Sequence, residues 1–320
     1  MKIIDPQFEE LSSEGINPLI LGERCIRVCY KSEDKIEEGS AVKLIRGIIR
    51  AGHTAMLEHI PVYFKIEKDK AEKIVFMHKE ERLEDDFDED YYNQQSKLLQ
   101  GLFSSRFANN LFTTDFIYTS TNLRVLYEID PEYVDEFIDN NGERYTLKDI
   151  PYIHSCRWED ARYSFFKRIT ILFTMDRIGS QSFCRHRLFS FAQESTRWCN
   201  YLKEKFGSEI SIINPCWLKE GDEEEFQKDM EEIEKLYFKW INKGYKAEEA
   251  RAFLPFGLKT EIIMTGFEDT WRGFLDLRDE QHAHLQAREL AAPLKEYLME
   301  KKYLYYGDKI EIKEEIKYEL

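Results

Sequence analysis

The chain has 320 residues, with 46 basic and 61 acidic side chains, which gives a formal net charge of −15. A hydrophobic fraction of 42% and an aromatic fraction of 14% exclude a disordered chain and indicate a globular protein. The strong negative charge argues against general binding to nucleic acid or to an anionic membrane. We find neither a hydrophobic run of transmembrane length nor a signal peptide after Met1, so we expect a soluble, cytoplasmic protein.

Hydrophobic periodicity predicts one helix and one strand in the first 66 residues. Residues 40–52 place an apolar stripe at helical spacing, with Ser40 as the expected N-cap and Gly52 at the end. A strand is expected over residues 62–66, where alternate hydrophobic residues share one face.

From about residue 67 to residue 160, the hydrophobic pattern becomes less regular and predicts only short elements. Short helices are expected at 67–79, 133–140 and 147–150. Residues 80–90 are dominated by acids and lack glycine turns, which favours a solvated helix end or loop over a magnesium site.

Regular elements return in the second half. A strand is predicted over residues 165–174, after which Asp176 caps a short helix that runs to Cys184. The remaining predictions are helices over 222–241 (ended by Gly244), 246–253 (interrupted by Pro255), 260–266 and 275–301, and a terminal strand over 309–313.

Six cysteines are present, and none of them form a CxxC pair. Because no signal peptide points to an oxidising compartment, we expect reduced, mostly buried thiols. His154 and Cys156 are two residues apart, but no second pair with zinc-ligand spacing follows, so no metal site is predicted.

Residues 185–198 hold the densest cluster of functional groups in the chain, with three arginines, a histidine and two serines. The charges do not recur at one helical spacing, which argues against a solvated helix face. The planar fork of arginine matches phosphate and carboxylate oxygens, so the cluster suits a ligand with phosphates and a polar ring. For an isolated Arg-His-Arg triplet, a surface patch of ion pairs would be the simpler interpretation.

The whole pattern is more specific than its triplet. Arg185-His186-Arg187 is followed after seven residues by Ser195, with Ser190 and Arg197 in register. This resembles the signature of the flavin-dependent thymidylate synthases, which methylate dUMP to dTMP with FAD, NADPH and methylene-tetrahydrofolate and have no cysteine nucleophile. Three further segments support the resemblance, namely residues 53–59, 250–255 and 275–283.

The resemblance implies a fold class and an assembly. The expected fold is α+β, with an antiparallel sheet flanked by helices, and the expected assembly is a homotetramer with its sites at subunit interfaces. Residues 20–66 and 160–300 align with the family, whereas residues 67–160 have no counterpart in its compact bacterial members. We therefore expect a single domain over residues 1–320, with 67–160 as an insertion in a strand-to-strand connection.

The resemblance also implies two sets of site residues. The cofactor-binding set, for FAD, is His53, Glu58, Arg185, His186, Arg187, Gln193 and His282. The substrate-binding set, for dUMP, is Ser182, Arg185, Gln193, Glu194, Ser195, Thr196, Arg197, Arg251 and Arg278. Arg278 is the expected catalytic residue, because a guanidinium at the O2/N3 edge of uracil stabilises negative charge on the ring.

The chain departs from the family pattern at several positions. The departures are Ala55-Met56-Leu57 for Thr-Pro-Phe, Ala192-Gln193 for Asn-Glu, and Phe267, Asp269 and Gly273 for residues that help bind FAD. Arg272 is available to replace the charge lost there. These changes leave open a related flavin- and folate-dependent enzyme with a hydroxymethylated product, and a nucleotide-binding homologue that has lost flavin.

Cysteine-dependent thymidylate synthases use a different route, in which the nucleophile lies in a Pro-Cys-His segment. This chain has Pro215-Cys216-Trp217 and lacks that histidine, so we interpret Cys216 as structural.

Overall fold

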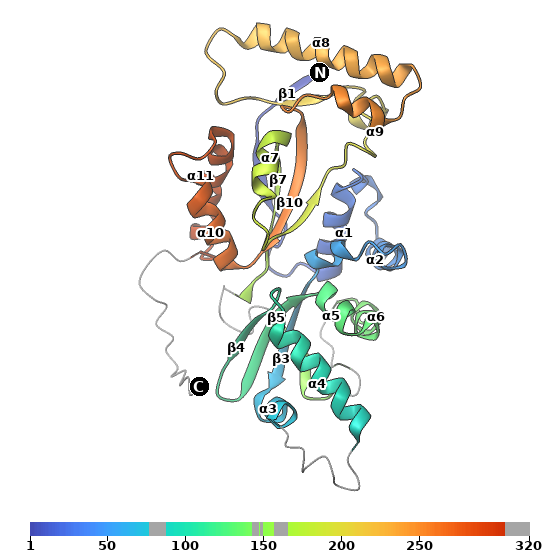
Figure 1. Cartoon of the computed structure of the whole chain (residues 1–320), viewed down its shortest axis with the longest axis vertical. Helices are drawn as coiled ribbons and strands as arrows, with labels where there is room; N and C mark the ends of the chain where they lie inside the picture. The colour runs from blue at the N-terminus through green and yellow to red at the C-terminus, as the bar shows by residue number, and fades with distance from the viewer. Residues whose placement is uncertain (77–87, 143–146, 148–149, 157–165, 305–320) are drawn as a thin grey trace. The chain divides into compact units, whose positions relative to one another are not determined.

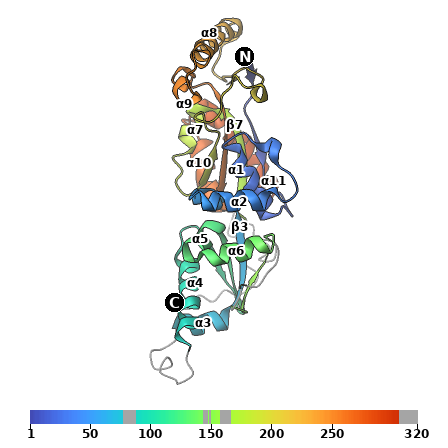
Figure 2. The ribbon, with the colours of Figure 1, turned by 90° about the vertical axis from the view of Figure 1, so that its right-hand side faces the viewer.

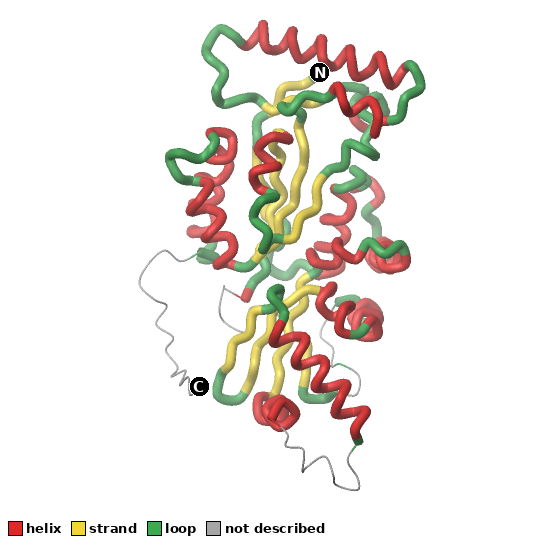
Figure 3. Tube along the Cα trace, viewed as in Figure 1, coloured by secondary structure: helices red, strands yellow, loops and turns green. Residues whose placement is uncertain are grey.

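The computed structural model describes residues 1–76, 88–142, 147, 150–156 and 166–304. They form two compact units (Figure 1). Unit 1 comprises Met1–Glu14, Glu23–Glu37 and Ile169–Lys302, and unit 2 comprises Gly15–Gly22, Glu38–Arg168 and Tyr303–Leu320. Each unit combines helices with an antiparallel sheet, as the secondary-structure colouring in Figure 3 shows, which confirms the α+β class.

Unit 1 is built on a four-stranded antiparallel sheet in the order β2-β7-β10-β8. The strands are β2 (Gln7–Glu10), β7 (Ile169–Asp176), β10 (Lys259–Gly266) and β8 (Ser190–Gln193). β10 pairs with β7 and with β8, so Ile262 lies opposite both Phe173 and Gln193. Its residues 262–266 are buried on both faces, as expected for a central strand.

Helices surround this sheet, and α7 packs against both β7 and β10. They are α7 (Arg177–Phe183), α8 (Glu223–Asn242), α9 (Ala247–Ala250), α10 (Glu268–Arg278) and α11 (Leu285–Glu300), with 3-10 turns at Glu33–Lys35, Glu204–Phe206 and Arg251–Phe253. α1 (Pro18–Val28) begins in unit 2 and ends in unit 1. Phe183, Phe189, Trp271 and Phe274 form an aromatic core between α7, α10 and the sheet.

At one end of unit 1, β1 (Lys2–Ile4) pairs in parallel with β9 (Ser211–Ile213). α8 lies beside this pair in both ribbon views (Figures 1 and 2). Tyr237 of α8 is buried in one hydrophobic cluster with Ile210 and Ile212, which fixes α8 to the unit.

Unit 2 has a second four-stranded antiparallel sheet, in the order β4-β5-β3-β6. Its strands are β3 (Pro61–Glu67), β4 (Asn109–Phe112), β5 (Phe116–Asn122) and β6 (Ile153–Ser155). Its helices are α2 (Ser40–Arg50), α3 (Lys68–Phe76), α4 (Glu89–Ser104), α5 (Leu123–Ile129) and α6 (Pro131–Asp139), with a 3-10 turn at Thr54–His59.

The predicted helix over 40–52 is confirmed, but its N-cap is not Ser40. Gly39 takes that position with φ +76, and Ser40 is already helical. The C-terminal end follows from Gly52, whose φ of +73 lets the N–H groups of Gly52 and His53 bond to the carbonyls of Ile49 and Ile48. His53 therefore helps to close this helix through its backbone.

The structure has two four-stranded sheets where one antiparallel sheet was expected. The strand expected over 62–66 lies in the unit 2 sheet, whereas the strand expected over 165–174 begins at Ile169 and lies in the unit 1 sheet. The block 67–160 supplies β4, β5 and β6. Strands β5 and β6 pair with β3, and β4 pairs with β5. These short strands escaped sequence analysis because their hydrophobic runs are brief and interrupted by polar residues.

Residues 260–266, predicted as a helix, form strand β10. A short apolar run has no decisive periodicity, and the β-branched residues at 260, 262, 263 and 265 favour a strand that is buried on both faces. The helix predicted over 275–301 is two helices, α10 and α11, which are separated by residues 279–284.

The other predicted helices are confirmed. They are α3, α6, α7 with its Asp176 cap, α8 with Gly244 at its end, and α9 with the following 3-10 turn. The predictions for residues 77–87, 148–149 and 309–313 lie outside the described part of the chain, and Asp88 is the N-cap of α4.

None of the six cysteines forms a disulfide bond, but most of them are not buried as expected. Cys25 and Cys199 are buried, Cys29 and Cys156 are half-buried, and Cys184 and Cys216 are exposed. Within the described residues, no helix is long and apolar enough to span a bilayer, and no group of His, Cys, Asp and Glu side chains is arranged to hold a metal ion.

Candidate active site

The arginine motif folds as a turn, a strand and a second turn, all in unit 1. Residues 184–189 leave the end of α7 as a turn, residues 190–193 form β8, and residues 196–198 turn away from the sheet. At about 3.3 Å per residue, the four residues of β8 span roughly 13 Å. The Arg-His-Arg triplet and the Ser195-Thr196-Arg197 turn therefore lie at opposite ends of one strand.

An open pocket of about 660 Å³ lies at the triplet end and is lined by Cys184, Arg185, Arg187, Phe189 and Phe191. Arg185 and Arg187 are exposed, and neither forms an ion pair within the described residues. The pocket therefore combines two available cations with aromatic side chains, which suits an anionic ligand with planar rings.

Arg278, at the end of α10, is held against the triplet. Its Nε donates to Nε2 of His186 at 3.0 Å, and an Nη2 hydrogen donates to the Ser182 carbonyl at 2.8 Å. Burial, with a contribution from the charge on Arg185, lowers the pKa of Arg278 from its usual value. A guanidinium has five N–H donors, so three of them have no partner within the described residues.

His186 is neutral at physiological pH. Burial, followed by the charge on Arg278, lowers its pKa to about 4. Because Nε2 accepts from Arg278, the ring hydrogen is on Nδ1. The imidazole also packs edge-on against Phe274, with 4.9 Å between ring centroids, so its orientation is fixed.

Ser182 and Gln193 make hydrogen bonds within the unit. The Ser182 hydroxyl donates to the Gly179 carbonyl at 2.7 Å. The Gln193 amide donates to the hydroxyls of Ser180 and Thr260, at 2.9 and 3.2 Å. These contacts fix Gln193 to α7 and β10, while Ser190 has a buried hydroxyl with no hydrogen-bond partner in the described residues.

The second turn begins at Glu194, whose side chain is buried and is bonded by the Tyr201 hydroxyl at 2.8 Å and Lys259 at 2.9 Å. The Ser195 N–H donates to the Cys29 carbonyl at 3.1 Å. Thr196 is buried, whereas the Arg197 side chain is 59% exposed and lies 3.6 Å from Glu248. This turn therefore presents Arg197 outward from an anchored backbone.

Arg251 and His282 are both exposed. Arg251 begins the 3-10 turn after α9, and His282 lies in the segment between α10 and α11. The two other expected cofactor contacts belong to unit 2: His53 is exposed, and the Glu58 carboxylate forms an ion pair with Arg124. The structure thus groups the motif residues and Arg278 within unit 1 and places His53 and Glu58 in unit 2.

At the start of α10, where the sequence departs from the family pattern, the structure forms an ion pair. Glu268 is buried, and its carboxylate lies 3.3 Å from Arg272. The Arg272 charge, expected to compensate for the missing family residues, is therefore paired with Glu268. Phe267 is buried at the start of α10.

Sequence analysis missed the residues that surround Glu194. Lys259 and Glu261 lie two apart on β10 and share one face of that strand, but the segment was predicted as a helix. An alternating Lys-x-Glu at the start of a β-branched run was the available signal. The Tyr201 contact has no sequence signal, because it arises from the path of the second turn.

Comparison with known proteins identifies the family. Residues 116–302, more than half of the chain, match the family model described as thymidylate synthase complementing protein, and the chain belongs to this family. The match includes the motif, Arg251 and Arg278, and it also includes part of the predicted insertion, from β5 onward.

Several curated relatives are described as flavin-dependent thymidylate synthases. The Pyrococcus furiosus protein is 30% identical over 162 residues, which cover 50% of this chain and 64% of the relative. The Corynebacterium efficiens protein is 26% identical over 145 residues, which cover 42% and 58%. The chain thus spans less than two thirds of the length of these relatives.

Among solved structures, the chain is similar to the UMP/dUMP methylase PolB from Streptomyces cacaoi bound with 5-Br dUMP. The sequences are 14% identical, the alignment covers 95% of this chain and 93% of that one, and the TM-score is 0.38. A similarity at this level carries no weight for the site.

Proposed function

We propose that this chain is a flavin-dependent thymidylate synthase, which methylates dUMP to dTMP with methylene-tetrahydrofolate as carbon donor and NADPH as reductant. Family membership and the names of the curated relatives support this proposal. The observation on which it chiefly rests is Arg278, a part-buried guanidinium fixed by His186 and Ser182 beside a pocket with two available arginines.

FAD is the cofactor implied, and the residues of the pocket fit it. The forks of Arg185 and Arg187 match the oxygens of a diphosphate, and Phe189 and Phe191 offer apolar surface to a planar ring. Bound there, FAD would supply the hydride that reduces the transferred carbon unit. The buried Ser190 hydroxyl is a further polar group at this motif without a protein partner in the described residues.

The dUMP phosphate is proposed to bind the turn at the other end of β8. Arg197 offers an exposed fork, because its contact with Glu248 at 3.6 Å is solvent-exposed and weak. The Ser195 N–H is already bonded to Cys29, so the donors proposed are the Ser195 hydroxyl, Thr196 and Arg197.

Arg278 is proposed to polarise the uracil ring. Its contacts with His186 and Ser182 hold the guanidinium in place and leave other N–H donors for the O2/N3 edge. Because His186 is neutral, the developing negative charge on the ring is stabilised by Arg278 itself. This is electrostatic stabilisation by a preorganised donor.

The remaining site residues are proposed with the roles that the family implies. His53, Glu58 and His282 keep the cofactor-contacting roles that the family implies for each of them, although the Glu58 carboxylate is already paired with Arg124. Arg251 is exposed and would reach the phosphate bound by a neighbouring subunit of a homotetramer. Size-exclusion chromatography with light scattering tests the assembly, and a monomer would contradict it.

The decisive experiment is the mass of the product. Purified protein is incubated with FAD, NADPH, methylene-tetrahydrofolate and dUMP, and the nucleotides are analysed by mass spectrometry. We expect dTMP with the wild-type protein and none with Arg278→Ala, while Lys235→Met, a change to an exposed ion pair on α8, leaves the yield unchanged.

Two other outcomes would favour a different function for this chain. A hydroxymethylated nucleotide would identify a related flavin- and folate-dependent enzyme. Binding of dUMP by a folded, colourless protein that fails to retain FAD would identify a nucleotide-binding homologue. The pairing of Arg272 with Glu268 is the observation that favours this second candidate.

A further inference from the structure

A buried cluster of charged groups adjoins the turn proposed to bind phosphate. Lys259 lies 2.9 Å from Glu194 and 2.7 Å from Glu261, and the Tyr201 hydroxyl donates to the second Glu194 oxygen at 2.8 Å. The Glu194 side chain is only 1% exposed, and the side chains of Lys259 and Glu261 are each 16% exposed. Both carboxylate oxygens of Glu194 are thus bonded within the protein.

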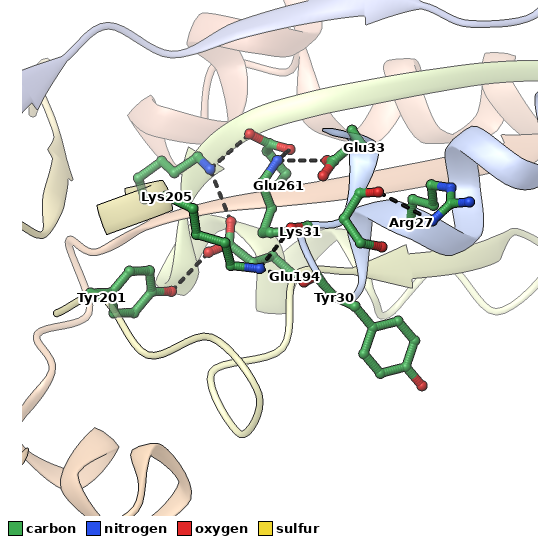
Figure 4. Close-up of polar contacts among 10 residues, drawn as sticks. Arg27, Tyr30, Lys31, Glu33, Glu194, Tyr201, Lys205 and Glu261 are labelled. Atoms are coloured by element: carbon green, nitrogen blue, oxygen red, sulfur yellow. Dashed lines mark hydrogen bonds and ion pairs between the residues drawn. The ribbon is translucent and has the colours of Figure 1, made fainter. Parts of the chain in front are cut away.

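The cluster continues into the segment that follows α1 (Figure 4). Lys31 lies 2.7 Å from Glu261 and 2.6 Å from Glu33, and its φ is +47. Lys205 donates to the Lys31 carbonyl at 2.9 Å. Side chains from three separate segments, the turn after α1, the start of β10 and the region 194–205, are therefore tied together.

The pairing within the cluster favours the charged forms of Lys259 and Glu261. Burial lowers the pKa of Lys259, but Glu194 and Glu261 outweigh it and raise the pKa above the usual value. Burial raises the pKa of Glu261, but Lys259 and Lys31 outweigh it and lower the pKa. Burial and Glu194 raise the pKa of Tyr201, so its hydroxyl remains a donor. Lys259, Glu261 and Tyr201 thus each retain the protonation state in which they bond to their partners.

The backbone around the cluster is anchored at both ends of the turn. The Glu194 N–H donates to the Glu261 carbonyl at 2.8 Å, and the Ser195 N–H donates to the Cys29 carbonyl at 3.1 Å. The Ser195 carbonyl in turn accepts from the N–H of Cys199 at 2.9 Å. Arg197 and Trp198 project outward from this framework, with 59% and 63% exposure.

We propose that Glu194, Lys259 and Tyr201 are positioning residues that hold the Ser195–Arg197 turn in the conformation that binds the phosphate of a nucleoside monophosphate. The inference rests on the proposed function, because it takes that turn as the phosphate site. Burying a carboxylate and an ammonium is costly unless both are fully paired, so the cluster admits one geometry of the turn. A preformed turn binds more tightly because less ordering is needed on binding.

The test is binding of dUMP and of deoxyuridine, which lacks the phosphate, to purified full-length variants by isothermal titration calorimetry. Tyr201→Phe removes one hydrogen bond to the Glu194 carboxylate and retains the ring. We expect its Kd for dUMP to rise about tenfold, since a hydrogen bond to a charged group is lost. Its affinity for deoxyuridine and its kcat at saturating dUMP should change less than about twofold.

Lys259→Met should weaken dUMP binding further, and Lys259→Arg should restore part of it by keeping a cation beside Glu194 and Glu261. Lys235→Met removes the exposed pair with Glu232 at 2.7 Å and serves as the matched control, with no change in either affinity. If Lys259→Met does not fold, Tyr201→Phe and Lys259→Arg decide the question.

The two possible failures are distinguishable. If wild-type protein binds no dUMP, the proposed function fails. If wild-type protein binds dUMP and Tyr201→Phe binds it equally well, or loses deoxyuridine affinity to the same extent, the cluster stabilises the fold without positioning the phosphate turn, and the inference is overturned.

Discussion

Replacing Arg278 with alanine separates its effect on stability from the catalytic effect that we propose for it. The change removes the hydrogen bonds to His186 at 3.0 Å and to the Ser182 carbonyl at 2.8 Å. A fully buried hydrogen bond from a charged donor contributes about 1.5–3 kcal/mol. Arg278 is only part-buried and water replaces some of the loss, so we expect the free energy of unfolding to fall by about 1–2 kcal/mol.

The expected catalytic effect is larger than the effect on stability. Loss of one preorganised donor to a developing oxyanion costs about 10²–10³ in kcat, or roughly 3–4 kcal/mol. A domain with about 5–15 kcal/mol of stability remains folded after losing about 1–2 kcal/mol, so unfolding cannot account for such a drop. Arg278→Lys keeps the charge but not the planar fork, and we expect an intermediate loss of about tenfold.

The assays are single-turnover kinetics at saturating dUMP and FAD, thermal unfolding, and an NMR titration of His186. In Arg278→Ala the pKa of His186 should rise from about 4 but stay below 6.5, because burial, the larger cause of its lowering, remains. An Arg278→Ala variant that is folded and retains more than about a tenth of the wild-type kcat would refute the assignment of Arg278.

Three further predictions concern stability. His186 has a pKa of about 4 in the folded protein against a usual value of 6.5, so the unfolded chain binds this proton first as the pH falls. The free energy of unfolding therefore decreases as the pH drops through this window. In His186→Phe this pH dependence should be smaller, as measured by denaturant titrations between about pH 7 and about pH 5. Gly266→Ala would place a Cβ 2.7 Å from the Phe189 ring, and thermal unfolding should show a loss of about 1–3 kcal/mol, whereas Gly273→Ala, with open space around it, should be neutral or stabilising. Gly52→Ala, at φ +73, should lower stability by about 1–2 kcal/mol, and equal stability of this variant and Gly47→Ala would contradict the left-handed helix end.

The parts of the fold that sequence analysis predicted well are those in which local chemistry decides the structure. Helix α8 has twenty residues with one apolar stripe and a glycine after its end, so periodicity alone places it. Asp176 was recognised as an N-cap because its carboxylate lies where the first N–H groups of α7 need an acceptor. Neither element depends on which partner it packs against.

The parts that it missed depend on tertiary partners. Strand β10 has an apolar run too short to show a period, and its pairing with both β7 and β8 is what buries it on both faces. The block after β3 was treated as an insertion because no family segment matched it, yet it provides three of the four strands of the unit 2 sheet. Resemblance to a family places motifs, but it does not show how an unmatched segment pairs.

In the candidate site, too, some features follow from the local sequence and others depend on tertiary contacts. The motif placed Arg185, Arg187 and Arg197 as available cations, and the structure leaves all three exposed. Glu194, which was also expected to contact the substrate, is buried and is bonded to Tyr201 and Lys259. An exposed carboxylate next to the turn proposed to bind phosphate would repel that ligand. Its pairing with Lys259 removes that repulsion and leaves Arg197 to set the local potential.

The Arg-His-Arg triplet and the Ser195–Arg197 turn are separated along β8, and this separation is relevant to the proposed reaction. The triplet and the second turn lie at the two ends of a four-residue strand, roughly 13 Å apart. The motif therefore carries cations at two separate places on the backbone, which suits the two anionic ligands of the proposed reaction. A reaction between a dinucleotide cofactor and a nucleoside monophosphate requires such an arrangement, with the reacting rings between the two phosphate sites. Because the sheet and not a flexible loop sets this spacing, a change that slips the register of β8 against β10 should abolish the reaction even with every arginine intact.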